Sequence, residues 1–246
     1  MTLVTVITVC KNAEKTIAKT IESVYAQTYP HIEYLIIDGR SSDNTVNIIQ
    51  SYEQKFQGRL QWVSEPDEGI YDAMNKGINM AHGAVIGIIN SDDWYESNAV
   101  EMVINAYSEH RDVVYYGILR VIEDGKEIML KSINHHYLHR DVVGHPAYFV
   151  SKLIYQKHGL YRLDYKIASD YELMMRLVSL QVPFIQINSI LANYNQGGYS
   201  SKYGTTTSNE QIKIRYEYGY ISKKKMYFQM VKNFIGYILR KLNDFL

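Results

Sequence analysis

The sequence predicts an α/β protein with a doubly wound, mostly parallel sheet, and two observations support this. The first is an alternation of strand-like and helix-like segments, which is typical of βαβ units with helices on both faces of a sheet. The strand-like runs lie at 3–9, 33–38, 59–63 and 84–89, and the helix-like segments at about 13–27, 43–56, 70–82 and 97–110. The second is size, since 246 residues with 46% hydrophobic content can bury one substantial core.

After residue 112 the pattern changes to short strands, which predicts a small antiparallel addition to the same core. The turn Glu123-Asp124-Gly125-Lys126 separates two of these strands, at 118–122 and 127–130, as in a hairpin. The remaining expected elements are helices at about 151–158 and 169–180, a strand at 184–187 and a mobile loop rich in Gly, Ser and Thr at 196–209. We divide the chain into a main domain, 1–215, and a basic amphipathic C-terminal helical segment, 216–246.

Composition and charge narrow the class of protein. The formal net charge is zero, so we expect no nucleic-acid partner, yet residues 223–246 carry six basic side chains and one acidic side chain, a local charge of +5. The single cysteine, Cys10, excludes an internal disulfide and a multi-cysteine zinc site, which fits a reducing cytosol. The N-terminus reads as a first strand and lacks the basic region and cleavage site of a signal peptide. We therefore expect a cytoplasmic protein.

Polar residues follow each of the first four strands, at the sheet edge where ligands bind in open α/β folds. The adjacent carboxylates Asp92 and Asp93 come directly after a buried strand. They suit a divalent cation and a diphosphate, because Mg²⁺ takes one or two carboxylates and completes its shell from phosphates and water. Alone, such a pair is more typical of a turn or of a cap of the next helix than of a metal site. If the strand ends meet at one rim, Asp38 and Asp67 can accept hydrogen bonds from a base and a ribose.

Six segments in this order resemble the family 2 inverting glycosyltransferases, which have the GT-A fold. They are Thr8-Val9-Cys10-Lys11-Asn12, Ser23-Val24-Tyr25-Ala26-Gln27-Thr28-Tyr29, the run from Ile36 to Thr45, the run from Ser64 to Gly77, Asn90-Ser91-Asp92-Asp93 and Ala168-Ser169-Asp170-Tyr171-Glu172-Leu173. The resemblance covers roughly residues 3–200. It departs from the family at Cys10, where an aromatic residue is frequent, and in the acidic motif Ser91-Asp92-Asp93, which leaves Asp93 for the metal and Asp92 for the sugar or ribose. A dinucleotide-binding Rossmann domain would instead have a glycine-rich fingerprint after the first strand, and none follows it here.

The resemblance implies transfer of one sugar from a nucleoside-diphosphate sugar, expected to be a UDP-sugar, to a hydroxyl of a glycan or a lipid-linked saccharide. Negative charge grows on the leaving diphosphate, which a bound cation offsets, and the attacking hydroxyl loses its proton to a base. The resemblance places Mg²⁺ or Mn²⁺ at Asp93 and assigns the base to Asp170, at the start of a predicted helix. The expected donor contacts are Thr8, Asn12, Asp38, Asp67, Lys76 and Asp92. His145 is expected to face the acceptor or the diphosphate, or else to be a structural histidine.

Two other functions stay open at this point. A sugar-1-phosphate nucleotidyltransferase also has a doubly wound nucleotide domain with acidic metal ligands, although a Gly-rich basic loop is expected after its first strand. A nucleotide-sugar-binding protein without catalysis is the non-enzyme alternative. The motif Gln-x-x-Arg-Trp of processive synthases is absent from the sequence, so a single transfer step is expected.

The C-terminal segment carries apolar residues at helical spacing beside several cations. The stripe consists of Tyr227, Val231, Phe234, Ile238, Leu242 and Phe245, widened by Phe228, Ile235, Leu239 and Leu246. Its longest uninterrupted apolar stretch is far short of the roughly 20 residues that span a bilayer, but the stripe suits a flat position in an anionic membrane interface. It also suits packing on the catalytic domain or on a homodimer mate. We expect membrane contact through 223–246, at the inner face of the cytoplasmic membrane.

Overall fold

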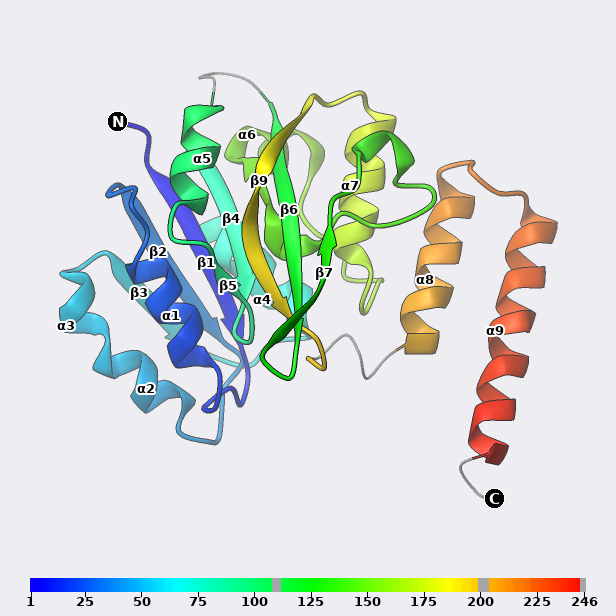
Figure 1. Cartoon of the computed structure of the whole chain (residues 1–246), viewed down its shortest axis with the longest axis horizontal. Helices are drawn as coiled ribbons and strands as arrows, with labels where there is room; N and C mark the ends of the chain where they lie inside the picture. The colour runs from blue at the N-terminus through cyan, green and yellow to red at the C-terminus, as the bar shows by residue number, and fades with distance from the viewer. Residues whose placement is uncertain (108–111, 199–203, 244–246) are drawn as a thin grey trace.

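The structure, a computed structural model, describes residues 1–107, 112–198 and 204–243 (Figure 1). The predicted helix end at 108–110, the centre of the predicted loop at 199–203, and Phe245 and Leu246 lie outside these ranges. Nine strands of the described residues form one sheet. They are β1 (Val4–Cys10), β2 (Ile32–Asp38), β3 (Leu60–Ser64), β4 (Val85–Asn90), β5 (Trp94–Tyr95), β6 (Val114–Glu123), β7 (Lys126–Lys131), β8 (Tyr148–Ser151) and β9 (Phe184–Asn195).

The first half of the sheet is parallel, as predicted. The strand order is β3-β2-β1-β4-β8-β6-β9-β5, with β7 paired to β6 outside this path. β1 pairs in parallel with β2 and β4, and β2 with β3, while β8 runs antiparallel between β4 and β6. In this register Cys10 lies beside Asp38, and Val9 beside Asn90. The carboxyl ends of the first strands therefore meet at one edge, where the predicted polar residues follow them.

Helices cover both faces of this sheet. They are α1 (Ile17–Tyr25), α2 (Thr45–Ser51), α3 (Glu53–Phe56), α4 (Ile70–Met80), α5 (Ala99–Asn105), α6 (Lys152–His158), α7 (Ser169–Ser179), α8 (Gly204–Glu217) and α9 (Lys223–Asn243). Alternate residues of β1 enter two hydrophobic clusters, Val4 and Val6 with α1, α2 and α5, and Ile7 and Val9 with α4, α6 and α7. Because side chains alternate along a strand, the two clusters lie on opposite faces of the sheet. This arrangement confirms the predicted doubly wound α/β class.

Gly77 lets α4 approach the sheet closely. A Cβ at this position would lie 2.6 Å from Ile7 Cγ2 on β1, which is too near for two carbon atoms. The absent side chain therefore sets how deep α4 sits, and with it the position of the residues at the start of that helix.

The second half differs from the prediction in extent. The hairpin β6–β7 is present, and Asp124 and Gly125 in its turn both have positive φ (49° and 77°), as a two-residue hairpin turn requires. β9 is far longer than the predicted strand at 184–187, and it pairs in parallel with β6 over most of its length. β8 and the two-residue β5 were not predicted, because strands this short carry too little periodicity.

The predicted loop at 196–209 is wrong from Gly204 onward, where α8 begins. The Ser- and Thr-rich start of α8 has low intrinsic helix propensity. Ile212 and Ile214 of this helix are buried, so tertiary packing supports it. The domain boundary expected after residue 215 falls inside α8. Figure 1 shows α8 and α9 as a helical pair beside the α/β core. Within the described residues, no helix has both the length and the apolar character needed to cross a bilayer.

Candidate active site

A cavity of about 980 Å³ opens at the carboxyl ends of β1 and β4. Its wall combines the turn after β1, the start of α4, the turn after β4, the start of α7, the end of β9 and the N-terminal half of α8. A smaller cavity of about 480 Å³ lies at the amino ends of the same strands, where Leu3, Ala84 and Lys152 line it. Of the two, the larger contains predicted site residues.

Three of the predicted donor contacts, Asn12, Asp67 and Asp92, line this cavity together. Asn12 has positive φ (52°), and its side-chain oxygen accepts a 2.8 Å hydrogen bond from the Ser42 backbone. The Asp67 carboxylate packs against Gly39, where a Cβ would lie 2.1 Å from Asp67 Oδ2. Glycine at position 39 therefore makes the room that this carboxylate occupies at the cavity wall.

The other three predicted donor contacts, Thr8, Asp38 and Lys76, are not among the residues that line the cavity. Thr8 is fully buried, and its hydroxyl accepts a 3.0 Å hydrogen bond from Tyr34.

Asp38 is also fully buried, and its carboxylate accepts hydrogen bonds from the Ser41 backbone and from the hydroxyls of Ser41 and Ser64. These hydrogen bonds fix the conformation of the loop after β2. The Lys76 ammonium forms ion pairs with Glu65 (3.0 Å) and Asp72 (3.3 Å) on the surface. These three side chains do not line the cavity, and their contact with a donor stays a prediction.

The adjacent residues Asp92 and Asp93 have opposite orientations. Asp92 lines the cavity, and burial raises its pKa above the usual 3.8. Asp93 is only 1% exposed, and its Oδ1 accepts a 2.9 Å hydrogen bond from the Asn195 backbone at the end of β9. Burial, together with the negative charge of Asp92, raises the pKa of Asp93 well above its ordinary value. Asp93 thus joins the turn after β4 to β9, whereas Asp92 lines the cavity, and the expected metal contact of Asp93 stays a prediction.

The residues present fit a divalent cation that shares its ligands with a substrate. Within the described part of the chain, no three His, Cys, Asp or Glu side chains gather as a ready-made metal site. Asp92 offers a carboxylate with a burial-raised pKa on the cavity wall. One protein carboxylate, completed by phosphate oxygens and water, is an ordinary arrangement for Mg²⁺ or Mn²⁺ at a diphosphate. A cage built only from protein ligands would not fit here.

Asp170 also lines the cavity, in the first turn of α7. Its Oδ1 accepts a 2.8 Å hydrogen bond from the hydroxyl of Tyr71, which also contacts the Ile167 carbonyl at 2.6 Å. Burial, and then the charge of Asp170, raises the pKa of Tyr71 well above 10, so the phenol stays protonated and donates. A carboxylate held in this way has one defined orientation toward the cavity.

His145 lines the cavity in a short 3₁₀ helix (His145–Ala147) and is 8% exposed. Its ring packs edge-on against Tyr148, with centroids 5.1 Å apart. Neither ring nitrogen has a hydrogen-bond partner within the described residues. Burial lowers the pKa of His145, although the nearby Asp170 opposes this, so the imidazole is neutral near pH 7. A buried imidazole with both nitrogens unpaired is typical of a ligand-binding position.

Sequence reasoning missed Glu210 of α8, which holds the segment that leads into α7. Its carboxylate accepts hydrogen bonds from three consecutive backbone N–H groups, those of Lys166 (2.8 Å), Ile167 (2.9 Å) and Ala168 (2.9 Å). Asp170 follows two residues later. The only sequence signal was an acidic residue just after the expected loop at 196–209, which carries no information about a partner 42 residues away.

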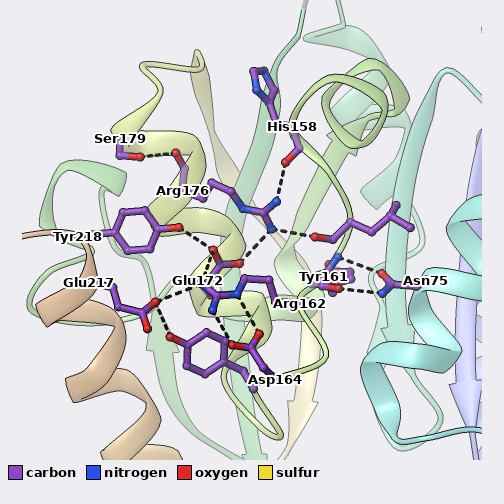
Figure 2. Close-up of polar contacts among 12 residues, drawn as sticks. Asn75, His158, Tyr161, Arg162, Asp164, Glu172, Arg176, Ser179, Glu217 and Tyr218 are labelled. Carbon is purple, nitrogen blue, oxygen red and sulfur yellow. Dashed lines mark hydrogen bonds and ion pairs between the residues drawn. The ribbon is translucent and has the colours of Figure 1, made fainter.

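A second contact joins α8 to α7 deeper in the protein (Figure 2). Glu172 is fully buried, forms an ion pair with Arg176 (3.0 Å) and accepts a 2.6 Å hydrogen bond from the hydroxyl of Tyr218. Arg162 adds a 3.1 Å ion pair to Glu217 at the end of α8. The first turns of the helix that carries Asp170, and the segment before it, are therefore held by Glu210 in α8 and by Tyr218 just after α8.

Comparison with known proteins gives a consistent result. The family model described as glycosyl transferase family 2 matches residues 5–176. An uncharacterized glycosyltransferase of Mycobacterium tuberculosis is 32% identical over 205 residues, which are 80% of this chain and 77% of the relative. A PGL/p-HBAD biosynthesis glycosyltransferase of Mycobacterium bovis is 26% identical over 206 residues, which are 77% of this chain and 76% of the relative.

Solved structures share the fold at low sequence identity. S. aureus TarS in complex with UDP has a TM-score of 0.67 at 14% identity, over 94% of this chain and 70% of that chain. The mannosyltransferase PcManGT from Pyrobaculum calidifontis, in complex with GDP-Man and Mn²⁺, has a TM-score of 0.69 at 15% identity, over 90% of this chain and 65% of that chain. These likenesses confirm the expected GT-A fold. Together with the family match over most of the sequence, they show that the chain belongs to glycosyl transferase family 2.

Proposed function

We propose that this protein is an inverting glycosyltransferase that moves one sugar from a nucleoside-diphosphate sugar to a hydroxyl of a glycan or a lipid-linked saccharide. The observation that carries the proposal is that Asp92 and Asp170, from two distant parts of the chain, line the same cavity. We favour a UDP-sugar, since UDP and UDP-GlcNAc are bound by TarS, which shares the fold. GDP-Man in PcManGT makes a guanine nucleotide the second candidate.

The chemistry divides between the two sides of the cavity. On the donor side, Asn12 and Asp67 are assigned to the nucleoside, and Asp92 would hold Mg²⁺ or Mn²⁺ beside the diphosphate. The cation, when bound, offsets the charge that grows on the leaving group. The bond from the anomeric carbon to the phosphate oxygen breaks as the bond to the acceptor oxygen forms on the opposite face of the sugar.

On the acceptor side, Asp170 takes the proton of the attacking hydroxyl. Tyr71 occupies Oδ1 of this carboxylate, so Oδ2 is the oxygen that we assign to the proton. The neutral imidazole of His145 offers one donor and one acceptor nitrogen, and we assign it to hydroxyl groups of the acceptor or of the transferred sugar.

A donor-turnover assay with Mg²⁺ or Mn²⁺ tests the function. A transferase releases nucleoside diphosphate and needs both Asp92 and Asp170, so Asp92→Asn and Asp170→Asn should each strongly reduce release. Pyrophosphate production would instead identify a nucleotidyltransferase. If UDP- and GDP-sugars bind but none is turned over, with or without added acceptor, the chain is a binding protein and our proposal is rejected.

A thermal-shift screen of nucleoside diphosphates supplies the base preference. A ligand that binds only the folded state raises the unfolding temperature by mass action. We expect UDP to stabilise the protein more than GDP, and more with Mn²⁺ than with EDTA.

A further inference from the structure

The apolar face of α9 is directed away from the protein. Seven large apolar side chains on this face are between 41% and 71% exposed: Tyr227, Phe228, Val231, Phe234, Ile235, Ile238 and Leu239. The contacts with α8 come from the other face, where Met226 is buried and Asn233 donates a 2.9 Å hydrogen bond to Asn209. A helix that docks onto a soluble domain normally turns its apolar side inward. The reversed arrangement here leaves an apolar surface that indicates an interaction site.

The charges of α9 select the kind of partner. Between Lys223 and Asn243 there is no Asp or Glu, and six residues are basic: Lys223, Lys224, Lys225, Lys232, Arg240 and Lys241. At 100° per residue, Lys225 and Lys232 lie along one edge of the apolar face and Lys223 along the other. A second copy of this helix would bring equal positive charge into contact, which opposes association. An anionic surface complements both the apolar face and its cationic margins.

We propose that α9 lies flat on an anionic lipid surface, with its apolar face in the headgroup region and Lys223, Lys225 and Lys232 at the phosphate level. A cationic helix with aromatic and aliphatic residues on one side is the usual form of such interfacial anchors. Its 21 residues span about 30 Å along the surface, at 1.5 Å per residue.

The docked helix would also place the cavity beside the lipid. Thr207 and Gln211 of α8 line the cavity, and α9 packs on α8, so one helix diameter of about 10 Å separates the lipid-facing helix from the cavity wall. Figure 1 shows the start of α8 and the end of α9 on the same side of the molecule. This step rests on the proposed function. It makes the acceptor a saccharide whose lipid anchor remains in the bilayer while its hydroxyl reaches Asp170.

Vesicle co-sedimentation of the full chain, without donor or acceptor, tests the surface independently of catalysis. We expect binding to vesicles of phosphatidylcholine mixed with phosphatidylglycerol, weaker binding in high salt and little binding to phosphatidylcholine alone. The double variant Phe228→Ser/Phe234→Ser should bind about 100-fold more weakly, from the apolar area that no longer enters the interface. The pair Lys225→Gln/Lys232→Gln should bind about 30-fold more weakly, from two cations near an anionic leaflet.

Matched variants elsewhere give the controls. Ile128→Ser/Leu130→Ser removes two apolar side chains of similar exposure from β7, and Lys126→Gln/Lys157→Gln removes two surface charges. Both should bind vesicles like the unmodified chain. Equal loss in the control and α9 variants, or no binding of the unmodified chain to anionic vesicles, would overturn the proposal. A dimer in light scattering that dissociates in Phe228→Ser/Phe234→Ser, without vesicle binding, would assign the face to a second copy and overturn it too.

The acceptor class has its own readout. Phe228→Ser/Phe234→Ser should keep donor hydrolysis while losing transfer to a saccharide embedded in vesicles. Equal transfer by this variant and the unmodified chain would reject the lipid-linked acceptor. If the unmodified chain showed no donor hydrolysis, the proposed function would be rejected, and the vesicle result would still stand.

Discussion

The hydroxyl of Tyr71 donates a 2.8 Å hydrogen bond to Oδ1 of Asp170, and this bond joins the first turn of α4 to the first turn of α7 at the cavity wall. α4 follows the donor-side segment that contains Asp67, whereas α7 carries the proposed base. The bond therefore couples the position of the donor half to that of the base.

Asp170→Asn should lower kcat by about 100- to 10,000-fold, because the acceptor hydroxyl loses its proton acceptor. Tyr71→Phe should lower kcat by about tenfold, since the carboxylate keeps its charge but loses the bond that orients it. Initial rates at saturating donor, with nucleoside diphosphate affinity measured by calorimetry, check both. If Asp170→Asn lost donor affinity and kept kcat, Asp170 would be a donor ligand and not the base.

Asp92→Asn should abolish the effect of Mn²⁺ on UDP affinity, whereas Asp93→Asn should leave that effect nearly intact. The reason is that Asp92 faces the cavity while Asp93 is directed to the Asn195 backbone. Calorimetric titration of UDP in Mn²⁺ and in EDTA measures the difference. The opposite ranking of the two variants would restore the metal to Asp93.

The pH dependence of stability should change in Asp92→Asn. An unfolded Asp ionises near 3.8, while burial raises the pKa of Asp92 in the folded protein. The folded state thus retains a proton that the unfolded state has lost, and the associated stability disappears as pH rises through this window. The unfolding temperature of Asp92→Asn minus that of the unmodified chain should therefore increase from about pH 4 to about pH 7. A constant difference across this range would contradict the assigned burial.

Glu210→Ala should reduce both stability and kcat with little change in the KM for the donor. Three backbone N–H groups lose a charged acceptor, which costs about 1.5–3 kcal/mol of unfolding free energy. The start of α7 then loses its fixed position, and Asp170 with it. Glu210→Gln, which retains an acceptor oxygen, should recover part of kcat, and Thr206→Ala on the exposed side of α8 serves as the control. A fall in stability without any fall in kcat would limit Glu210 to a structural role.

His145→Phe should retain the ring contact with Tyr148 and remove both unpaired nitrogens. We expect a loss of about tenfold in kcat/KM for the acceptor, with unchanged UDP affinity, from one lost hydrogen bond to a hydroxyl. Because burial lowers the pKa of His145, its contribution to stability is lost as pH falls below the usual 6.5, so the variant should resist mild acid better. Unchanged acceptor kinetics would leave His145 as a packing residue.

The sequence predicted the fold best where strands and helices alternate over a long stretch of the chain. The alternation of strands and helices through residue 105 predicted the parallel half of the sheet and the edge where the cavity opens. It could not assign neighbouring carboxylates, because Asp92 and Asp93 differ only in which way a turn directs them. The buried positions of Thr8 and Asp38 depend on contacts with Tyr34 and Ser64, which lie 26 residues away in each case.

Long-range contacts also explain what was missed in the second half. Intrinsic propensity disfavours a helix beginning with Gly204, yet Glu210 and Ile214 are fixed by α7 and the core, and the helix forms. β8 is only four residues long and is defined by its position between β4 and β6. A single sequence contains no direct signal for either arrangement.

The family match ends at Arg176, before α8 and α9 begin. Helix α9, which would direct the enzyme to a particular surface, thus lies beyond the residues that the family model matches, whereas α8 still contributes Thr207 and Gln211 to the cavity wall. Exchanging α8 and α9 between homologues should therefore change the surface to which an enzyme binds without changing its donor. The exchanged segment must keep equivalents of Glu210 and Tyr218. Those two side chains make the hydrogen bonds that hold this C-terminal segment to the start of α7.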